Sequence, residues 1–242
     1  MAVTEFGLWN NASSWSLVDW LTTPAVLKSF LFYAWLSIVF VAYFVGLYFF
    51  LHLIYSKTNT HYRTLDTQKK KVEYRTYTIS PIHHLTSIFI SIVTMFYACG
   101  DDKTVFNDME CMNTPRNLHV LAVMHTCSYF IVDTAVIIWW EKDLWGQLEM
   151  ICHHTLSILN LYAGFAFMNF TMTFGICLLF TEISTIFICL RWFLYTHGYG
   201  HSTCAAINTG VVFFAFLILR LGFQVFACFG YGFPMIIRQF NT

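Results

Sequence analysis

The sequence predicts an all-α integral membrane protein, a bundle of about six transmembrane helices around a central interior that carries polar residues. Of its 242 residues 57% are hydrophobic and only 11% are charged, whereas about a quarter of a soluble domain is charged. The apolar runs are long enough to cross a bilayer, and ionisable residues recur within them. Thirteen basic residues against thirteen acidic ones exclude a strongly basic nucleic-acid binder.

Six apolar runs are expected to cross the membrane. A bilayer core of about 30 Å takes about 20 helical residues, and polar clusters separate runs of that size. The predicted spans are Ser29–Tyr55, Ile82–Cys99, Leu118–Trp140, Leu148–Ala166, Met172–Tyr195 and Cys204–Pro234. Because the stretch 150–194 is apolar almost throughout, a re-entrant turn within it stays open as an alternative to two full spans.

The distribution of basic residues indicates which side of the membrane each loop faces. The segment 56–81 carries six Lys or Arg against two acidic residues, so the positive-inside rule makes it cytosolic. The N-terminal tail, residues 1–28, and the acidic loop 100–117 then face the lumen or the exterior. The glycosylation sequon Asn11-Ala12-Ser13 lies in that tail, which agrees with this orientation.

Cysteine usage offers one candidate disulfide. Six of the eight Cys lie inside apolar runs, where they act as small hydrophobic residues. Cys99 and Cys111 instead flank the polar loop. A disulfide between them is compatible with an oxidising lumen, and their spacing alone does not decide the matter.

Ionisable side chains within a span are costly and typically face the interior of the bundle. On the fourth span a repeat of about 100° per residue puts Glu149, His153 and Asn160 in one stripe and turns His154 about 100° away from His153. One histidine is therefore expected to face the cavity and the other to meet a neighbouring helix. The expected lipid-binding residues are Tyr129, Glu149, Asn160, Glu182, Arg191 and Arg220.

A buried histidine beside a carboxylate is a common arrangement for a general base or nucleophile, because the carboxylate fixes the tautomer of the ring. His153 or His154 with Asp133 would form such a pair, so these three are the candidate catalytic residues. The alternative is that the polar groups only satisfy one another, Asp133 or Glu182 with Arg220, and the histidines with Asn160 or backbone carbonyls.

The histidines do not predict a metal site. The pairs His83-His84 and His153-His154 are adjacent in the sequence and diverge on a helix, whereas a helical zinc or iron site uses residues three or four apart. The sequence also lacks a glycine-rich phosphate loop and a G-x-S-x-G nucleophile elbow. We expect neither a metal nor a tightly bound cofactor.

A succession of motifs resembles the TLC-domain family, which includes the ceramide synthases. The motifs are Ser128–Asp133, Ile151–His154, Thr181–Thr185 with Leu190–Leu194, and Phe213–Arg220. The resemblance covers about 57–232 and implies the TLC fold, in which about six helices surround a lipid-accessible cavity. The chain is expected to consist of two parts, a non-cytosolic tail, residues 1–28, and a membrane domain of the TLC type, residues 29–236.

In ceramide synthases the paired histidines belong to the active site, which moves an acyl chain from acyl-CoA to a long-chain base. His153 and His154 match that pair. Two aspartates that the synthases carry about thirty residues later are absent, because the aligned stretch reads Phe-Thr-Glu-Ile-Ser from Phe180 to Ser184. The Glu-x-Ser-Thr and Arg-Trp-Phe elements resemble instead the small TLC-domain proteins, a branch associated with lipid homeostasis.

Two hypotheses of function follow. In the first, the protein serves lipid homeostasis by binding or modifying acyl lipids in the cavity, and its enzymatic form is a His-dependent acyltransferase with acyl-CoA as co-substrate. In the second, it is a non-enzymatic lipid-binding or sensing protein, or an accessory subunit of a larger membrane complex. A transporter would need related halves, which the sequence lacks. The resemblance implies the endoplasmic reticulum, and a mitochondrial or other endomembrane location stays open.

Overall fold

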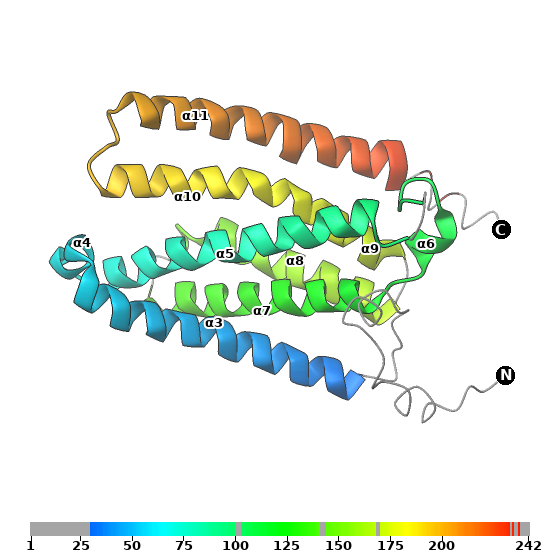
Figure 1. The fold of residues 1–242 in the computed structure, drawn as a ribbon, viewed down its shortest axis with the longest axis horizontal. Coiled ribbons are helices and arrows are strands. Elements are labelled where there is room, and N and C mark those ends of the chain that lie inside the picture. Colours follow the sequence, from blue (N-terminus) through cyan, green and yellow to red (C-terminus); the bar gives the residue numbers. More distant parts are fainter. Residues whose placement is uncertain are drawn as a thin grey trace.

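The computed structural model describes residues 30–99, 103–140, 144–167 and 170–232, together with Pro234 and Ile237. Its regular elements are helices that pass back and forth along one direction (Figure 1). The first four passes are α3 (Phe30–Thr58), α5 (Gln68–Phe96), α7 (Asn117–Trp140) and α8 (Leu148–Phe167), with short helices α4 (Thr60–Thr64) and α6 (Met109–Asn113) between them.

The fifth and sixth passes are each built from several helical segments. The fifth runs from α9 (Phe170–Leu178) through the 3₁₀ turn η3 (Leu179–Glu182) into α10 (Ile183–Thr196). The sixth runs from α11 (Thr203–Ala215) into the π-helical segments η4 (Phe216–Phe223) and η5 (Phe226–Gly232). The fifth pass crosses in one direction, so the stretch that left a re-entrant turn open forms two successive passes, α8 and then α9 to α10.

The described segments have the length and apolarity of membrane spans. Five of them are long and apolar enough to cross a membrane: Phe32–Thr58, Gln68–Phe96, Asn117–Trp140, Thr171–Thr196 and Thr203–Gly230. The fourth pass, α8, is not among these five, but its 20 residues are enough to cross a bilayer core of about 30 Å. The predicted fold class, an all-α integral membrane protein, is confirmed.

The second span begins earlier than the sequence predicted. Helix α5 starts at Gln68 rather than Ile82, so much of the basic segment expected as a loop is helical. Thr67 caps this helix by accepting a hydrogen bond from the Lys70 backbone at 3.2 Å. Pro81 lies inside the helix. Proline removes one backbone hydrogen bond and crowds the carbonyl four residues earlier, and α5 nevertheless continues through it, packed against α3, α7, α9 and α10.

Helices α5 and α7 form the centre of the bundle. More than half of the residues in their spans are buried, 56% and 61%, against 11% in α3 and 6% in the last span. The buried residues of α7 pack against α3, α5 and α8. Large apolar side chains stay exposed on α3 and α11, for example Phe49 and Phe213. These outer faces have the composition expected of a lipid-facing surface.

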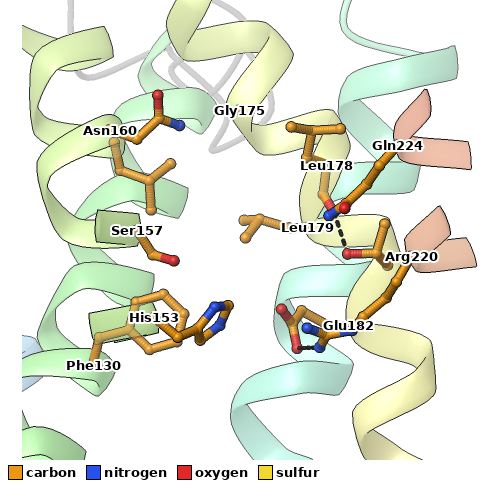
Figure 2. A pocket seen from close by; sticks show the side chains of 12 residues that line it. Phe130, His153, Ser157, Asn160, Gly175, Leu178, Leu179, Glu182, Arg220 and Gln224 are labelled. Atoms are coloured by element: carbon orange, nitrogen blue, oxygen red, sulfur yellow. Dashed lines mark hydrogen bonds and ion pairs between the residues drawn. The ribbon is translucent and has the colours of Figure 1, made fainter. Parts of the chain in front are cut away.

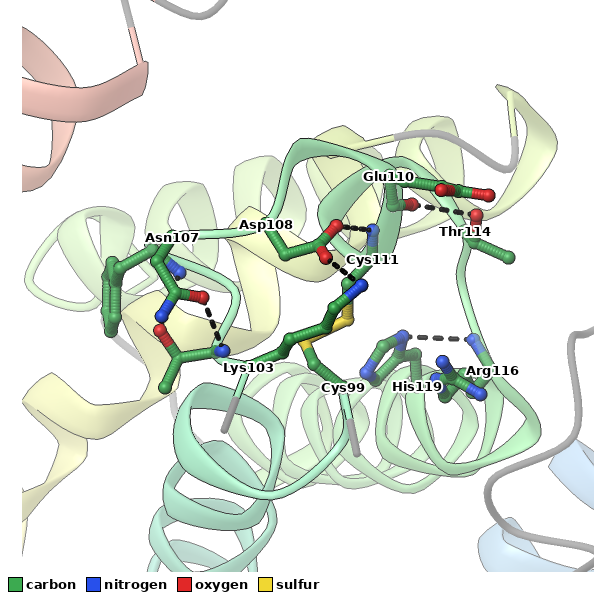
Figure 3. The surroundings of a disulfide bond; sticks show 11 residues. Cys99, Lys103, Asn107, Asp108, Glu110, Cys111, Thr114, Arg116 and His119 are labelled. Carbon is green, nitrogen blue, oxygen red and sulfur yellow. Dashed lines mark hydrogen bonds and ion pairs between the residues drawn. A yellow bond between two sulfur atoms is a disulfide. The ribbon is translucent and has the colours of Figure 1, made fainter. Parts of the chain in front are cut away.

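The two ends of the bundle differ in chemistry. At one end the loop after α5 is closed by a disulfide between Cys99 and Cys111, with a Cα–Cα distance of 5.5 Å (Figure 3). There the Lys103 ammonium, 2.6 Å from the Asp108 carboxylate, holds the pKa of Asp108 below its usual value. The basic start of α5 lies at the opposite end (Figure 1). A disulfide at one end and basic residues at the other agree with the orientation predicted from charge.

A close approach between α8 and α9 depends on Gly164. A Cβ atom at this position would lie 2.9 Å from the Cα atom of Met172, which is backbone and has little freedom to move. The two helices therefore cross with almost no side-chain volume between them. This contact fixes the α8 wall relative to the fifth pass.

We expect Gly164→Ala to destabilise the bundle by about 1–3 kcal/mol through overpacking. The matched control is Gly46→Ala in α3, where an added Cβ meets nothing within 4 Å and is expected to be neutral or to stabilise by up to about 1 kcal/mol. Reversible unfolding of the purified protein in detergent measures both changes. Equal effects of the two substitutions would contradict the close crossing.

Candidate functional site

A half-enclosed cavity of about 130 Å³ lies between α8 and the segments η3 and η4. Figure 2 shows polar side chains pointing into it from both sides. Its lining mixes apolar and polar residues: Phe130, His153, Ser157, Asn160, Leu161, Gly175, Leu178, Leu179, Thr181, Glu182, Arg220 and Gln224. The polar groups come from three separate passes of the chain, so the cavity exists only in the folded bundle.

One wall is a stripe of uncharged polar residues on α8. His153, Ser157 and Asn160 have the spacing of one helix face and lie one above another (Figure 2). The stripe covers about 10 Å along the helix at 1.5 Å per residue. Its groups are an imidazole, a hydroxyl and an amide, all of which both donate and accept hydrogen bonds when neutral.

The opposite wall is formed where two helices depart from α geometry. Glu182 ends the 3₁₀ turn η3, and Arg220 lies in the π-helical segment η4. Such irregular turns within long helices often occur at functional sites. The break at η3 contains no glycine or proline, so no residue type marks it.

The Glu182 carboxylate is buried and held by three groups through one oxygen. Its Oε2 atom lies 3.1 Å from His84 Nδ1 and 3.2 Å from an Arg220 nitrogen, and it accepts a hydrogen bond from the Thr185 hydroxyl at 2.8 Å. A buried carboxylate is tolerated only with such partners. Within the described residues Oε1 has no such partner, and Figure 2 shows one carboxylate oxygen directed toward the cavity.

The Arg220 guanidinium donates three hydrogen bonds to residues of the fifth pass. Its Nε donates to the Ser184 hydroxyl at 2.9 Å, and an Nη donates to the Thr185 hydroxyl at 2.7 Å. The same group lies 5.1 Å from the centre of the Phe216 ring. Arg220 therefore joins the sixth pass to the fifth. Its ion pair with Glu182 is one that the sequence analysis considered as an alternative to a catalytic role.

His84 is a site residue that the sequence analysis missed. It comes from α5, and its Nε2 is 2.9 Å from the Ser80 hydroxyl while its Nδ1 faces Glu182. The pair His83-His84 was considered only as a metal pair and set aside because of its spacing. The available signal was the presence of two costly histidines at the expected start of a span, and which residue they would meet depends on how the helices pack.

The adjacent histidines of α8 face different surroundings. His153 lines the cavity, whereas His154 is buried against α7, where its ring stacks on Phe130 at 4.7 Å. His154 Nδ1 is 3.1 Å from the Thr134 hydroxyl and 3.7 Å from the Asp133 carboxylate. The distance to Asp133 is longer than a hydrogen bond allows. A carboxylate-oriented histidine that also faces the cavity is therefore not assembled in this structure.

The remaining predicted site residues lie away from the cavity lining. Tyr129 and Asp133 are buried in the centre of the bundle, and the Tyr129 ring stacks on His83 at 3.9 Å. Glu149 is exposed in the first turn of α8. Arg191 is exposed on α10, with its guanidinium 5.5 Å from the Tyr195 ring. Of the predicted residues, His153, Asn160, Glu182 and Arg220 are brought together.

The cavity can form hydrogen bonds to a neutral polar group and contact an apolar chain. Ser157, Asn160 and Gln224 offer donors and acceptors, and Glu182 Oε1 offers a strong acceptor. Phe130, Leu178 and Leu179 supply apolar surface. Among the described residues, no three His, Cys, Asp or Glu gather in a way that could hold a metal ion.

Fold and site together define a multi-pass membrane protein with a small polar cavity inside the membrane-spanning bundle. The chain belongs to the TLC-domain family, because the family model of the TLC domain matches residues 73–241. The sequence resemblance to this family is thereby confirmed, and membership indicates a role in lipid metabolism or sensing. No solved structure matches the chain.

We expect Arg220→Met to destabilise the protein strongly, because it leaves the Glu182 carboxylate buried beside a neutral side chain. Breaking one partner of a buried pair costs about 3–5 kcal/mol, and the partial exposure of Arg220 puts the expected loss near 3 kcal/mol. The double variant Glu182→Gln with Arg220→Met should lose less than the sum of the single variants. Additive losses in detergent unfolding experiments would show that the pair is not coupled.

Proposed function

We propose that this protein binds an acyl lipid in the cavity between α8, η3 and η4 and serves lipid homeostasis through that binding. The observation that carries the proposal is the polar stripe of α8 facing an acceptor on Glu182, with leucines and Phe130 beside it. A lipid presents the complementary pattern, a hydrogen-bonding group joined to hydrocarbon.

The size of the cavity determines which part of the lipid it takes. A volume of about 130 Å³ is below the roughly 300–1,000 Å³ of pockets that enclose a whole drug-sized ligand. The cavity therefore suits the linkage region of a lipid, such as an ester, amide or hydroxyl. The hydrocarbon chains would extend along exposed apolar side chains such as Leu156 and Leu217.

Acyl transfer is a second candidate, favoured by the position of His153. Its ring lines the cavity and forms no hydrogen bond to another described residue, so its nitrogens remain accessible to a substrate. As a general base it would take the proton from a hydroxyl or amine that attacks the thioester of acyl-CoA, the expected co-substrate. Binding without transfer is the better supported proposal, because Asp133 orients neither histidine within hydrogen-bond distance.

The proposed location is the endoplasmic reticulum membrane. The Cys99–Cys111 disulfide supports a loop that faces an oxidising compartment, and the lumen of this organelle is one. Membrane lipids are the proposed partners. In the non-enzymatic alternative, the protein would be an accessory subunit in a complex with other membrane proteins.

We predict that His153→Ala and the cavity-filling Ser157→Phe reduce the lipid that co-purifies with the protein. His154→Ala is the matched control for the histidine, since His154 faces α7, and Leu159→Phe is the control for the bulky ring, since Leu159 is exposed on the same helix. Lipid mass spectrometry of the protein purified in detergent, and of membranes expressing each variant at equal level, measures both effects.

The outcomes separate binding from catalysis. Loss of co-purified lipid in the two cavity variants, with unchanged membrane composition, supports binding. A shift in membrane acyl composition with wild type that disappears with His153→Ala supports acyl transfer and identifies the lipid. The same lipid in all variants and controls would contradict both.

A further inference from the structure

A second cavity, of about 260 Å³, lies at the end of the bundle that carries the basic start of α5. It shares no lining residue with the cavity on η3 and η4. Its lining residues come from α4 and its C-terminal cap, from α5 and from α10: His61, Leu65, Lys70, Glu73, Trp192 and Thr196. The proposed function above does not involve this cavity.

The surroundings of this cavity are those of a membrane interface. Trp192 and the tyrosines at positions 55, 62 and 74 form a cluster of ring contacts there. Tryptophan and tyrosine are enriched at the level of lipid headgroups, where one end of the ring is wet and the other apolar. The cavity therefore lies where a headgroup, rather than an acyl chain, is available to fill it.

A carboxylate is fixed in the wall of the cavity. The Trp192 indole N–H donates to Glu73 Oε1 at 2.9 Å, and the indole itself stacks on the Tyr77 ring at 4.3 Å with an angle of 6° between the planes. Glu73 Oε2 forms no hydrogen bond to another described residue. The cavity thus presents a negative charge in a held position to a cationic group.

An unsatisfied nitrogen and a lysine lie in the same lining. His61 packs against His197 with ring centres 4.5 Å apart and the ring planes tilted by 31°, and its Nε2 is excluded from solvent without a hydrogen-bond partner in the described structure. Such a buried polar atom calls for a partner. Lys70 pairs with Asp66 at 2.9 Å, but both side chains are more than half exposed, so this pair is weak and easily exchanged.

The charges lie close enough to act on one small group. Lys70 and Glu73 are three residues apart on α5 and therefore neighbours on one helix face, about 5–6 Å apart at Cβ. We propose that this cavity binds the headgroup of a zwitterionic phospholipid, whose phosphate contacts Lys70 and His61 Nε2 and whose amine contacts Glu73. Ligand atoms then satisfy the orphaned nitrogen and neutralise both charges.

Other lipid classes fit this charge pattern less well. A polyanionic group such as coenzyme A or a polyphosphoinositide would bring several negative charges against Glu73. A neutral glyceride has no phosphate to offer Lys70 or the unpartnered His61 nitrogen. The volume of about 260 Å³ is also smaller than pockets that enclose a whole drug-sized ligand, which suits a headgroup whose chains stay in the bilayer.

Titration of the purified full-length chain in a maltoside detergent with short-chain lipids tests this proposal. Native mass spectrometry would compare dihexanoyl phosphatidylcholine, phosphatidylethanolamine and phosphatidic acid. We expect the two zwitterionic lipids to bind more tightly than phosphatidic acid. Glu73→Gln should weaken them about five-fold, the effect of one exposed ion pair at the upper end of its range, without weakening phosphatidic acid.

The variants are chosen to keep the fold. Glutamine at position 73 retains an oxygen that accepts the Trp192 N–H, so the wall keeps its hydrogen bond. Lys70→Ala is an exposed change and should weaken all three lipids. Its matched control is Lys57→Ala, which removes an exposed lysine at the same end of the bundle and should change nothing. Thermal unfolding of each variant identifies any that fail to fold. If Glu73→Gln fails to fold, Lys70→Ala still tests the proposal.

Three results would overturn the proposal. The first is tighter binding of phosphatidic acid than of the zwitterionic lipids. The second is an equal effect of Lys70→Ala and Lys57→Ala. The third is binding of soluble glycerophosphocholine as tight as that of dihexanoyl phosphatidylcholine, which would make the occupant a soluble metabolite rather than a lipid. The variants separate this cavity from the one beside Glu182, because Lys70 and Glu73 line only this one, so only the part of the binding that they change is assigned to it.

Discussion

The buried carboxylate of Glu182 is the constraint on which the arrangement of α5, the fifth pass and the sixth pass depends. An unpaired charge in an apolar bundle is expensive, so α5 and the sixth pass must each bring a partner, His84 and Arg220. The local 3₁₀ and π geometry accompanies this requirement, since Glu182 and Arg220 both lie in the irregular segments. Three passes of the chain are thereby joined through a single carboxylate oxygen.

The same contact leaves a cavity rather than a closed interface. The main packing partners of α8 are α7 and α9, and the close crossing at Gly164 holds α8 against the fifth pass at one end. Toward η3 and η4 the walls separate, and the polar stripe of α8 faces Glu182 across the cavity. The cavity therefore presents hydrogen-bonding groups and apolar surface side by side.

The sequence predicted the fold class, the number of passes and part of the site. Long apolar runs depend only on local composition, so they are readable without a structure, as is the helical spacing that separates His153 from His154. The contact between His84 and Glu182 could not be predicted from the sequence, because it depends on how α5 packs against η3. The predicted start of α5 was wrong, because Ile82 begins the apolar run, whereas the helix extends back through polar residues to its cap at Thr67. The cavity at His61 and Trp192 is lined by residues that are distant in the sequence, and no sequence motif predicts it.

The central claim is that the cavity beside Glu182 holds an acyl lipid, and photo-crosslinking tests it most directly. A phospholipid with a diazirine near the acyl linkage would be incorporated with the full chain into nanodiscs and irradiated, and adducts would be mapped by peptide mass spectrometry. The account predicts adducts at Leu161, Leu178 or Leu179, which Ser157→Phe abolishes while leaving adducts on the exposed Leu53 of α3 unchanged. Adducts confined to outer residues such as Leu53, or cavity adducts that persist with Ser157→Phe, would contradict it.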